Sequence, residues 1–191
     1  KTKKPEIIAL ELDRQRFLAL MQKGKRRLNL RGLSPTEAII IIIGYYSEKI
    51  LGKAVGTIPG QEMKTAINLA KENNAKISLI DQNIRITLKR LRKQLTFREK
   101  IRFITDIFAA PFQKRVRIDL NKVPEQEIID KIIKETKTKY PSIYKVLIEE
   151  RNHIMAKNLY KLIQNNQDKQ IVAVVGAGHE KEIIELLKKW K

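Results

Sequence analysis

The sequence predicts an α/β fold in which many helices surround a small, largely parallel central sheet. Short apolar runs rich in β-branched residues occur at 6–13, 76–80 and 171–175, and each is typical of a buried strand. Longer segments with helical spacing separate these runs, as in a sheet built from crossover connections. The 191 residues suffice for one domain with its own core, and no repeat or domain boundary interrupts them.

In the first half of the chain, turn and capping residues mark where helices begin. Helical spacing follows the first strand from Arg14 to about Lys23. The segment Ser34-Pro35-Thr36-Glu37 is a strong helix start, with an N-cap serine, a proline at the first helical position and a glutamate that completes a capping box. Pro59-Gly60 breaks the chain before a helix that continues to about Ala70.

The second half is expected to be mostly helical. The pattern is helical and basic from Arg85 to Phe112, with a break near Leu95-Thr96. Pro124 opens another helix, and Pro141 starts a long one that runs to about Asn166. The last strand is followed by a closing helix over 180–190.

Composition limits the classes of function. Apolar residues make up 42% and charged residues 32%, which favours a folded, soluble domain. The absence of cysteine excludes disulfides, thiolate metal sites and cysteine nucleophiles. The chain opens without a leader-type apolar region, and its longest apolar run, 38–43 with the residues after it, reaches about half of a bilayer span. The helix around Ile39–Ile50 suits either a homo-oligomer contact or the core.

The net charge of +19 has two interpretations. It indicates an anionic partner, or it is a solvated surface of lysines on outer helix faces. Cations are concentrated in Arg85–Arg102, but aromatic residues are sparse there and no nucleic-acid motif is present, so nucleic acid is not favoured. Anionic lipid headgroups fit better if the parent protein is attached to a membrane.

The most informative segment is Val174-Val175-Gly176-Ala177-Gly178-His179. It places one of the two histidines where an apolar strand turns through glycines into a helix. Ligands of open α/β sheets bind at the carboxyl ends of the strands, so His179 is a candidate site residue. The alternative is an ordinary strand–helix connection. A dinucleotide site is excluded because Lys181 stands where the third glycine would be.

Glu11 is expected at the same edge of the sheet. In the first strand Ile8, Leu10 and Leu12 point to one face, and Ile7, Ala9 and Glu11 to the other. If both faces are covered, Glu11 is a carboxylate at the carboxyl end of a buried strand.

Arg151 lies on an apolar stripe of the long helix, four residues after Leu147 and four before Met155, and Glu150 borders that stripe. A guanidinium on a core-facing stripe needs a carboxylate or several carbonyls, because an unpaired buried charge costs several kcal/mol. A structural Arg–Glu pair, or an arginine that reaches solvent, would also explain it. Glu11, Arg151 and His179 are expected to share one crevice.

These residue types point to acid–base or metal chemistry. Imidazole and carboxylate are common ligands of zinc and manganese, arginine stabilises oxyanions, and a second carboxylate moves protons. Two protein ligands are too few to establish a catalytic metal site from composition.

Several ordered motifs resemble the TraB/PrgY family, which includes the pheromone-shutdown proteins and is related to the Tiki metalloproteases. Together they cover nearly the whole chain, although Gln82 stands where the family more often has arginine. The matching segments are Pro5–Arg14, Pro59-Gly60-Gln61-Glu62-Met63 with Ala66, Asp81–Arg90, Glu150-Arg151-Asn152 with Met155-Ala156, and Val174–His179.

The resemblance implies a site made of two Gly-x-x-His motifs, a strand glutamate and a helical Glu-Arg pair. Glu11, Glu150, Arg151 and His179 match four of these positions. The first Gly-x-x-His would lie upstream of Lys1, so residues 1–191 are expected to be one TraB-like domain that is incomplete at its N-terminus. Hydrophobic spans of PrgY-like members would follow the domain, which implies that the full-length protein is membrane-associated.

Two functions follow as expectations. The first is a metal-dependent hydrolase of peptides, with a divalent ion (Mn, Co or Zn) held by Glu11, His179 and the upstream histidine, and with Glu150 and Arg151 as catalytic residues. There Arg151 would stabilise an oxyanion, and Glu150 would orient Arg151 or move a proton. The alternative is a non-catalytic module that binds or sequesters a peptide, with Arg151 clamping its carboxylate.

Overall fold

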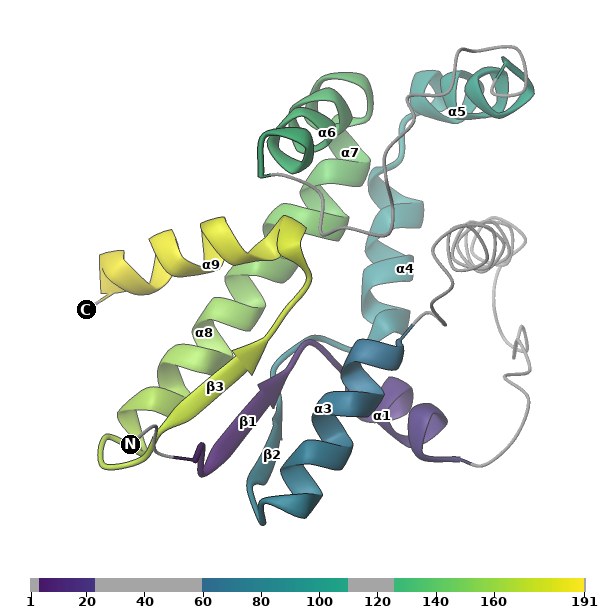
Figure 1. Cartoon of the computed structure of the whole chain (residues 1–191). Coiled ribbons are helices and arrows are strands. Elements are labelled where there is room, and N and C mark those ends of the chain that lie inside the picture. The colour runs from purple at the N-terminus through teal and green to yellow at the C-terminus, as the bar shows by residue number, and fades with distance from the viewer. Residues whose placement is uncertain (1–3, 23–59, 110–125, 191) are drawn as a thin grey trace.

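The computed structural model describes residues 4–22, 60–109 and 126–190, which form an α/β fold (Figure 1). Three parallel strands make the sheet, in the order β2-β1-β3: β1 (Ile7–Leu10), β2 (Lys76–Leu79) and β3 (Ile171–Val174). Leu10 is in register with Leu79 on one side and Val174 on the other, so all three strands end at the same level. The predicted fold class is confirmed.

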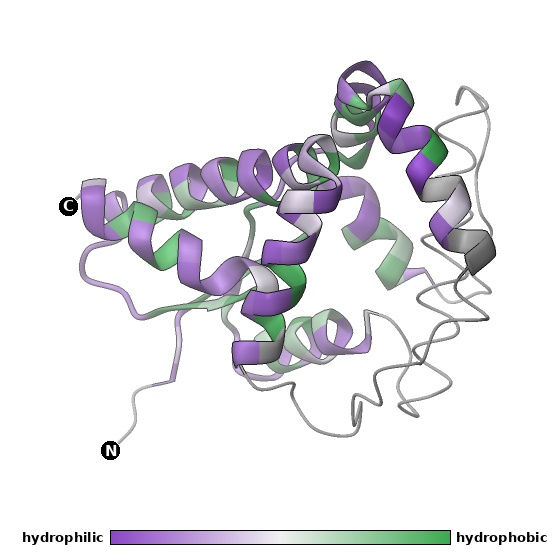
Figure 2. Ribbon diagram, turned by 90° about the horizontal axis from the view of Figure 1, so that it is seen from above, coloured by the Kyte–Doolittle hydropathy of each residue, from purple (hydrophilic) through white to green (hydrophobic). Residues whose placement is uncertain are grey.

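Helices cover both faces of the sheet. Ile8, Leu10 and Leu12 pack on the face covered by α3 (Gln61–Glu72), with Phe17 and Leu20 of α1 (Arg14–Met21) against the same core. On the opposite face Ala9 packs with α8 (Glu150–Gln164) and α9 (Ala177–Trp190). Figure 2 shows hydrophobic strands between helices that alternate hydrophobic and hydrophilic residues. The side chains of β1 therefore alternate between the two faces as expected, and Glu11 lies directly after the strand at an edge covered by helices.

Local capping explains several helix starts. Asp13 caps α1 by accepting hydrogen bonds from the backbone N–H groups of Gln15 and Arg16. Gly60 precedes α3 with a φ of 81°, a left-handed conformation that glycine adopts without strain. Asn83 caps α4 (Ile84–Gln94). Thr96 and Glu99 form a capping box at the start of α5 (Phe97–Ala109).

The predicted break near Leu95-Thr96 is therefore confirmed, because it separates α4 from α5. α6 (Gln126–Lys139) follows, and Pro141 is the first residue of α7 (Pro141–Tyr144). The long helix expected from Pro141 contains a π-helical turn, η1 (Lys145–Glu149), before it continues as α8. Such turns are frequent at functional sites, and this one comes directly before Glu150 and Arg151.

Some expectations fall on residues outside the described ranges. These are the helix start at Ser34–Glu37, the apolar helix around Ile39–Ile50, the end of the basic helical segment at Phe112 and the helix start at Pro124. Within residues 4–22, 60–109 and 126–190, no helix has the length and apolar character needed to cross a membrane.

Candidate functional site

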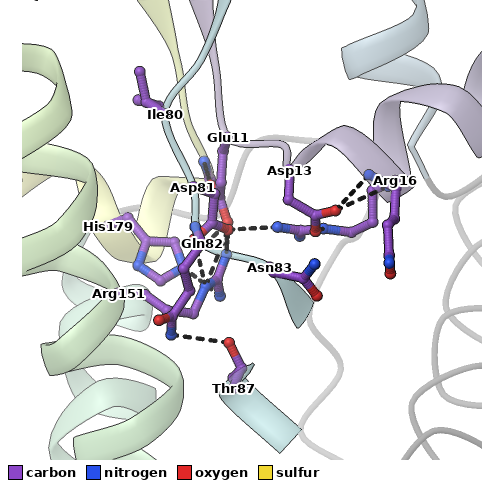
Figure 3. Close-up of polar contacts among 12 residues, drawn as sticks. Glu11, Asp13, Arg16, Ile80, Asp81, Gln82, Asn83, Thr87, Arg151 and His179 are labelled. Carbon is purple, nitrogen blue, oxygen red and sulfur yellow. Dashed lines mark hydrogen bonds and ion pairs between the residues drawn. The ribbon is translucent and has the colours of Figure 1, made fainter. Parts of the chain in front are cut away.

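A cluster of charged side chains lies at the carboxyl edge of the sheet (Figure 3). Glu11 comes directly after β1, Asp81 lies two residues after β2, and His179 lies in the first turn of α9 after β3. Arg151 reaches the same place from α8. Because the three strands end in register, residues that are far apart in the sequence meet at one edge.

The carboxylate of Glu11 joins three elements. Its Oε1 accepts a hydrogen bond from Nη2 of Arg151 at 2.5 Å and lies 3.4 Å from Nε2 of His179. Its Oε2 accepts from the backbone N–H of Gly176 at 2.6 Å, just before α9. A Cβ added to Gly176 would lie 3.3 Å from this oxygen, so the missing side chain permits the close approach. The helix N-terminus also favours the negative charge.

Each nitrogen of the Arg151 guanidinium donates to a hydrogen-bond acceptor. Nε and Nη2 donate to Asp81, and Nη2 also donates to Glu11. Nη1 donates to the carbonyl of Leu147 at 3.2 Å and lies 3.3 Å from Nε2 of His179. Burial works to lower the pKa of Arg151, but hydrogen bonds and charges from Asp81 and Glu11 outweigh it and raise this pKa. The guanidinium is therefore a fixed positive charge.

Asp81 is the anchor of this arginine, and its side chain is fully buried. It accepts from Nη2 of Arg151 at 2.6 Å and from Nη2 of Arg16 at 2.7 Å. Burial alone would raise the pKa of Asp81, yet Arg151 and Arg16 hold it below the ordinary value. Asp13 binds Nε of Arg16 at 2.7 Å and extends the network to α1.

His179 is buried, and a hydrogen-bond chain fixes its proton. Nδ2 of Asn152 donates to Oε2 of Glu182 at 2.6 Å, so the amide presents Oδ1 to Nδ1 of His179 at 2.5 Å. Because that oxygen only accepts, Nδ1 carries the proton, and Nε2 keeps a lone pair directed at Glu11 and Arg151. Burial is the main reason that the pKa of His179 lies below its ordinary value, with Arg151 acting in the same direction.

Glu150, the fourth expected residue, contacts a different part of the molecule. Its two oxygens accept from Nε and Nη2 of Arg90 at 2.6 and 2.7 Å, and Gln94 donates to Oε1 at 3.1 Å. The bond to Arg90 is the main reason that the pKa of Glu150 is lowered. The structure thus brings Glu11, Arg151 and His179 together, and Asp81 makes the contact with Arg151 that was expected of Glu150.

The donor chemistry of Glu11 and His179 fits part of a divalent metal site. A carboxylate oxygen and a bare imidazole nitrogen converge at 3.4 Å, and a second hydrogen bond orients each of them. In the part of the chain that the structure describes, no group of three or more histidine and acidic side chains is placed to hold an ion. Glu11 and His179 therefore offer two donor groups but not a complete ligand set among the described residues, and Arg151 lies against both.

Sequence reasoning gave no role to Asp81, Asn152 and Glu182. Asp81 had a usable signal, because it follows the second apolar strand as Glu11 follows the first. Asn152 is fully buried beside Arg151, within a motif that was already recognised. Glu182 gave no signal, since its role depends on the packing of α9 against α8.

By its fold and its site, this protein is a parallel α/β domain that carries an acid, a guanidinium and an imidazole at the carboxyl edge of its sheet. The chain belongs to the TraB/PrgY/gumN family, whose model matches residues 1–191. It is 37% identical over 194 residues to an uncharacterized protein of Methanocaldococcus jannaschii. That match covers 97% of this chain and 47% of the relative, so the chain spans about half of the relative's length.

Proposed function

We propose that this domain belongs to a metal-dependent hydrolase of the TraB/PrgY/Tiki type that acts on peptides, in a full-length protein attached to a membrane. Glu11 and His179 would be two of the ligands of the ion, and the remaining ligands would come from outside the described residues. Manganese, cobalt and zinc all accept this combination of carboxylate and imidazole.

One observation carries the proposal: the lone pair of His179 and the carboxylate of Glu11 converge beside a mostly buried, permanently charged arginine. The distances are 3.4 Å between Nε2 and Oε1, and 3.3 Å between Nε2 and Nη1 of Arg151. A cluster placed only to stabilise the fold would not need a histidine held neutral with its acceptor nitrogen aimed inward. Perturbed titratable groups gathered at a sheet edge are typical of active sites.

Each residue has a distinct task in this proposal. A bound divalent ion would supply a Lewis acid and a water molecule of lowered pKa. His179 offers Nε2 because Asn152 keeps the proton on Nδ1. Arg151 stabilises negative charge that develops on a substrate carbonyl oxygen through its fixed positive charge, without a new hydrogen bond, and Asp81 holds it in place. Glu150 acts only indirectly, through the position of α4 relative to α8.

The alternative, a peptide-sequestering module with Arg151 as the carboxylate clamp, has less support. Arg151 already donates to Asp81, Glu11 and Leu147, so a peptide carboxylate would have to displace one of these acceptors. A preformed clamp needs donors that face the ligand. Stoichiometric binding of a peptide without turnover, weakened by Arg151→Ala, would favour this second function.

The test is metal content and peptidase activity of the full-length protein and three variants. His179→Ala and Glu11→Ala are expected to lose most of the bound ion and to lower kcat/KM at least a hundredfold. His153→Ala is the matched control, because this exposed histidine contacts only the carbonyl of Glu149 among the interactions described. Absence of bound metal, together with equal turnover in all four proteins, would reject the hydrolase.

A further inference from the structure

We propose that the outer surface of the α4–α5 corner docks on an anionic lipid bilayer. We define this surface, the corner surface, by two exposed apolar side chains and the exposed cations around them. Its members are Arg85, Lys89, Arg92, Lys93, Phe97, Arg98 and Ile101. The site at the sheet edge plays no part in this proposal, which stands or falls independently of the hydrolase.

Polar contacts on its inner side fix the direction in which α5 faces. Glu99 is buried and accepts the backbone N–H of Ser142 at 2.8 Å. Farther along α5, the hydroxyl of Tyr140 donates to Asp106 at 2.6 Å. Figure 1 shows α5 beyond the end of α4 that is farther from the sheet. With Glu99 and Asp106 turned to the protein, the side that bears Phe97 and Ile101 faces outward.

The apolar part of the corner surface is more exposed than folding would favour. Phe97 is 76% exposed and Ile101 is 48% exposed, and their spacing of four residues puts them on one face of α5. A single exposed apolar side chain needs no explanation. An aromatic and an aliphatic residue on one helix face, next to arginines, are typical of helices that lie in a membrane interface.

The charged part is complementary to anionic headgroups. Arg98 shares the outer face of α5, and Arg92 and Lys93 are exposed in the last turn of α4. Within 84–102 the sequence has eight cations, and Glu99, its single acid, is buried and hydrogen-bonded to Thr96 and Ser142. Arg90 is paired with Glu150, whereas Arg85, Lys89, Arg92, Lys93 and Arg98 form no ion pair with any of the described residues. Cations near an anionic leaflet attract it additively.

A bilayer explains both parts of the corner surface, and a nucleic acid explains only one. Phosphates of either partner would pair with the cations. Phe97 could stack on a base, but single strands are usually bound by several aromatic side chains, and the corner surface has one. Burial of the Ile101 side chain is favourable in the hydrocarbon of a bilayer but not against a nucleic-acid backbone.

The test is co-sedimentation of the 191-residue chain with vesicles of phosphatidylcholine alone or mixed with phosphatidylserine. We expect binding to the mixed vesicles that weakens with salt. Arg92→Glu with Lys93→Glu should weaken it by roughly fivefold or more per residue, the effect of one interfacial cation. Phe97→Ala should weaken it about tenfold while the net charge stays constant.

Matched controls separate this surface from the overall charge of +19. Lys157→Glu with Lys161→Glu changes two exposed lysines of α8 by the same charge, and Ile163→Ala removes an apolar side chain that is 38% exposed. Binding that survives in these controls and fails in the corner variants supports the proposal. Equal losses in both sets, no binding to anionic vesicles, or corner-dependent binding of nucleic acid without vesicle binding would overturn it. Circular dichroism of each variant verifies folding.

Discussion

Asn152 fixes the tautomer of His179. Its Oδ1 lies 2.5 Å from Nδ1 of the imidazole, and its Nδ2 is committed to Glu182 at 2.6 Å, so the amide can only accept from the histidine. The consequence is an unprotonated Nε2 next to Glu11 and Arg151. A second layer of hydrogen bonds thus prepares the nitrogen that the proposed function requires.

The first prediction concerns this tautomer. Nitrogen-15 NMR of the imidazoles is expected to show His179 with a protonated Nδ1 and a bare Nε2 at neutral pH. Asn152→Leu removes the acceptor with the same branched shape and number of side-chain heavy atoms, so both tautomers should then be populated. The exposed His153 serves as an internal reference in the same spectra. A proton on Nε2 of His179 in the unmodified chain would contradict the relay.

The second prediction concerns stability below neutral pH. The pKa of folded His179 lies below the ordinary value of 6.5, mainly because the ring is buried. As pH falls below about 6.5, the imidazole of His179 binds a proton in the unfolded chain but not yet in the folded chain. The free energy of unfolding therefore decreases. Urea unfolding between about pH 5 and pH 7 measures this slope.

His179→Gln is the control for this slope, because it removes the titrating group. Its free energy of unfolding should depend less on pH in that interval. Asp81 does not interfere, since its lowered pKa makes stability fall only when pH drops below its ordinary value of 3.8. An unchanged slope in His179→Gln would show that other groups cause the effect.

The third prediction compares two arginine–carboxylate pairs. Asp81 is fully buried and holds Arg151 at 2.6 Å, whereas Glu150 holds Arg90, whose side chain is 49% exposed. Asp81→Asn should lower the free energy of unfolding by about 3–5 kcal/mol, because the mostly buried guanidinium of Arg151 loses its main counterion and keeps only Glu11. Glu150→Gln should lower it by less than about 1 kcal/mol.

Chemical denaturation of both variants measures the two losses. The same pair of variants also tests the assignment of roles, since Asp81 and not Glu150 contacts Arg151. If Glu150→Gln lowered the free energy of unfolding as much as Asp81→Asn, the exposed pair of Glu150 and Arg90 would contribute as much to stability as the pair of Asp81 and Arg151. That result would contradict the prediction.

Much of this arrangement follows from the sequence, for a physical reason. A strand alternates its side chains strictly, so the pattern of β1 was enough to put Glu11 on the face covered by α8 and α9. Parallel strands end at one edge, so Glu11 and His179 were expected to be neighbours. The helical pattern was likewise interrupted near Leu95-Thr96, where Thr96 and Glu99 form the cap of α5. Each of these inferences depends on short-range geometry.

The direction of Glu150 could not be inferred in the same way. It stands next to Arg151, but successive helical residues point about 100° apart, and the π-helical turn η1 shifts the register just before it. Its partner Arg90 lies 60 residues away in the sequence. The contacts of Asn152 and Glu182 also depend on how α8 and α9 pack, which no local pattern encodes.

The last prediction uses the two glycines at the start of α9. Gly176→Ala would place a Cβ 3.3 Å from Oε2 of Glu11, a contact that pushes the carboxylate away from the Gly176 N–H and from His179. Gly178→Ala would meet Ile133 at 3.8 Å, which is an ordinary van der Waals contact. The two variants add the same methyl group two residues apart, so they differ in this contact and not in chemistry.

Gly176→Ala is therefore expected to weaken binding of Co²⁺ or Mn²⁺ by the full-length protein about tenfold or more, because it disturbs a proposed ligand through its hydrogen-bond partner. Gly178→Ala should bind as the unmodified protein does, and its melting temperature should be equal or slightly higher, since alanine is the better helix former. Calorimetric titration and thermal unfolding measure both effects. Equal metal affinity in the two variants would mean that the bond between Gly176 and Glu11 does not position the carboxylate for metal binding.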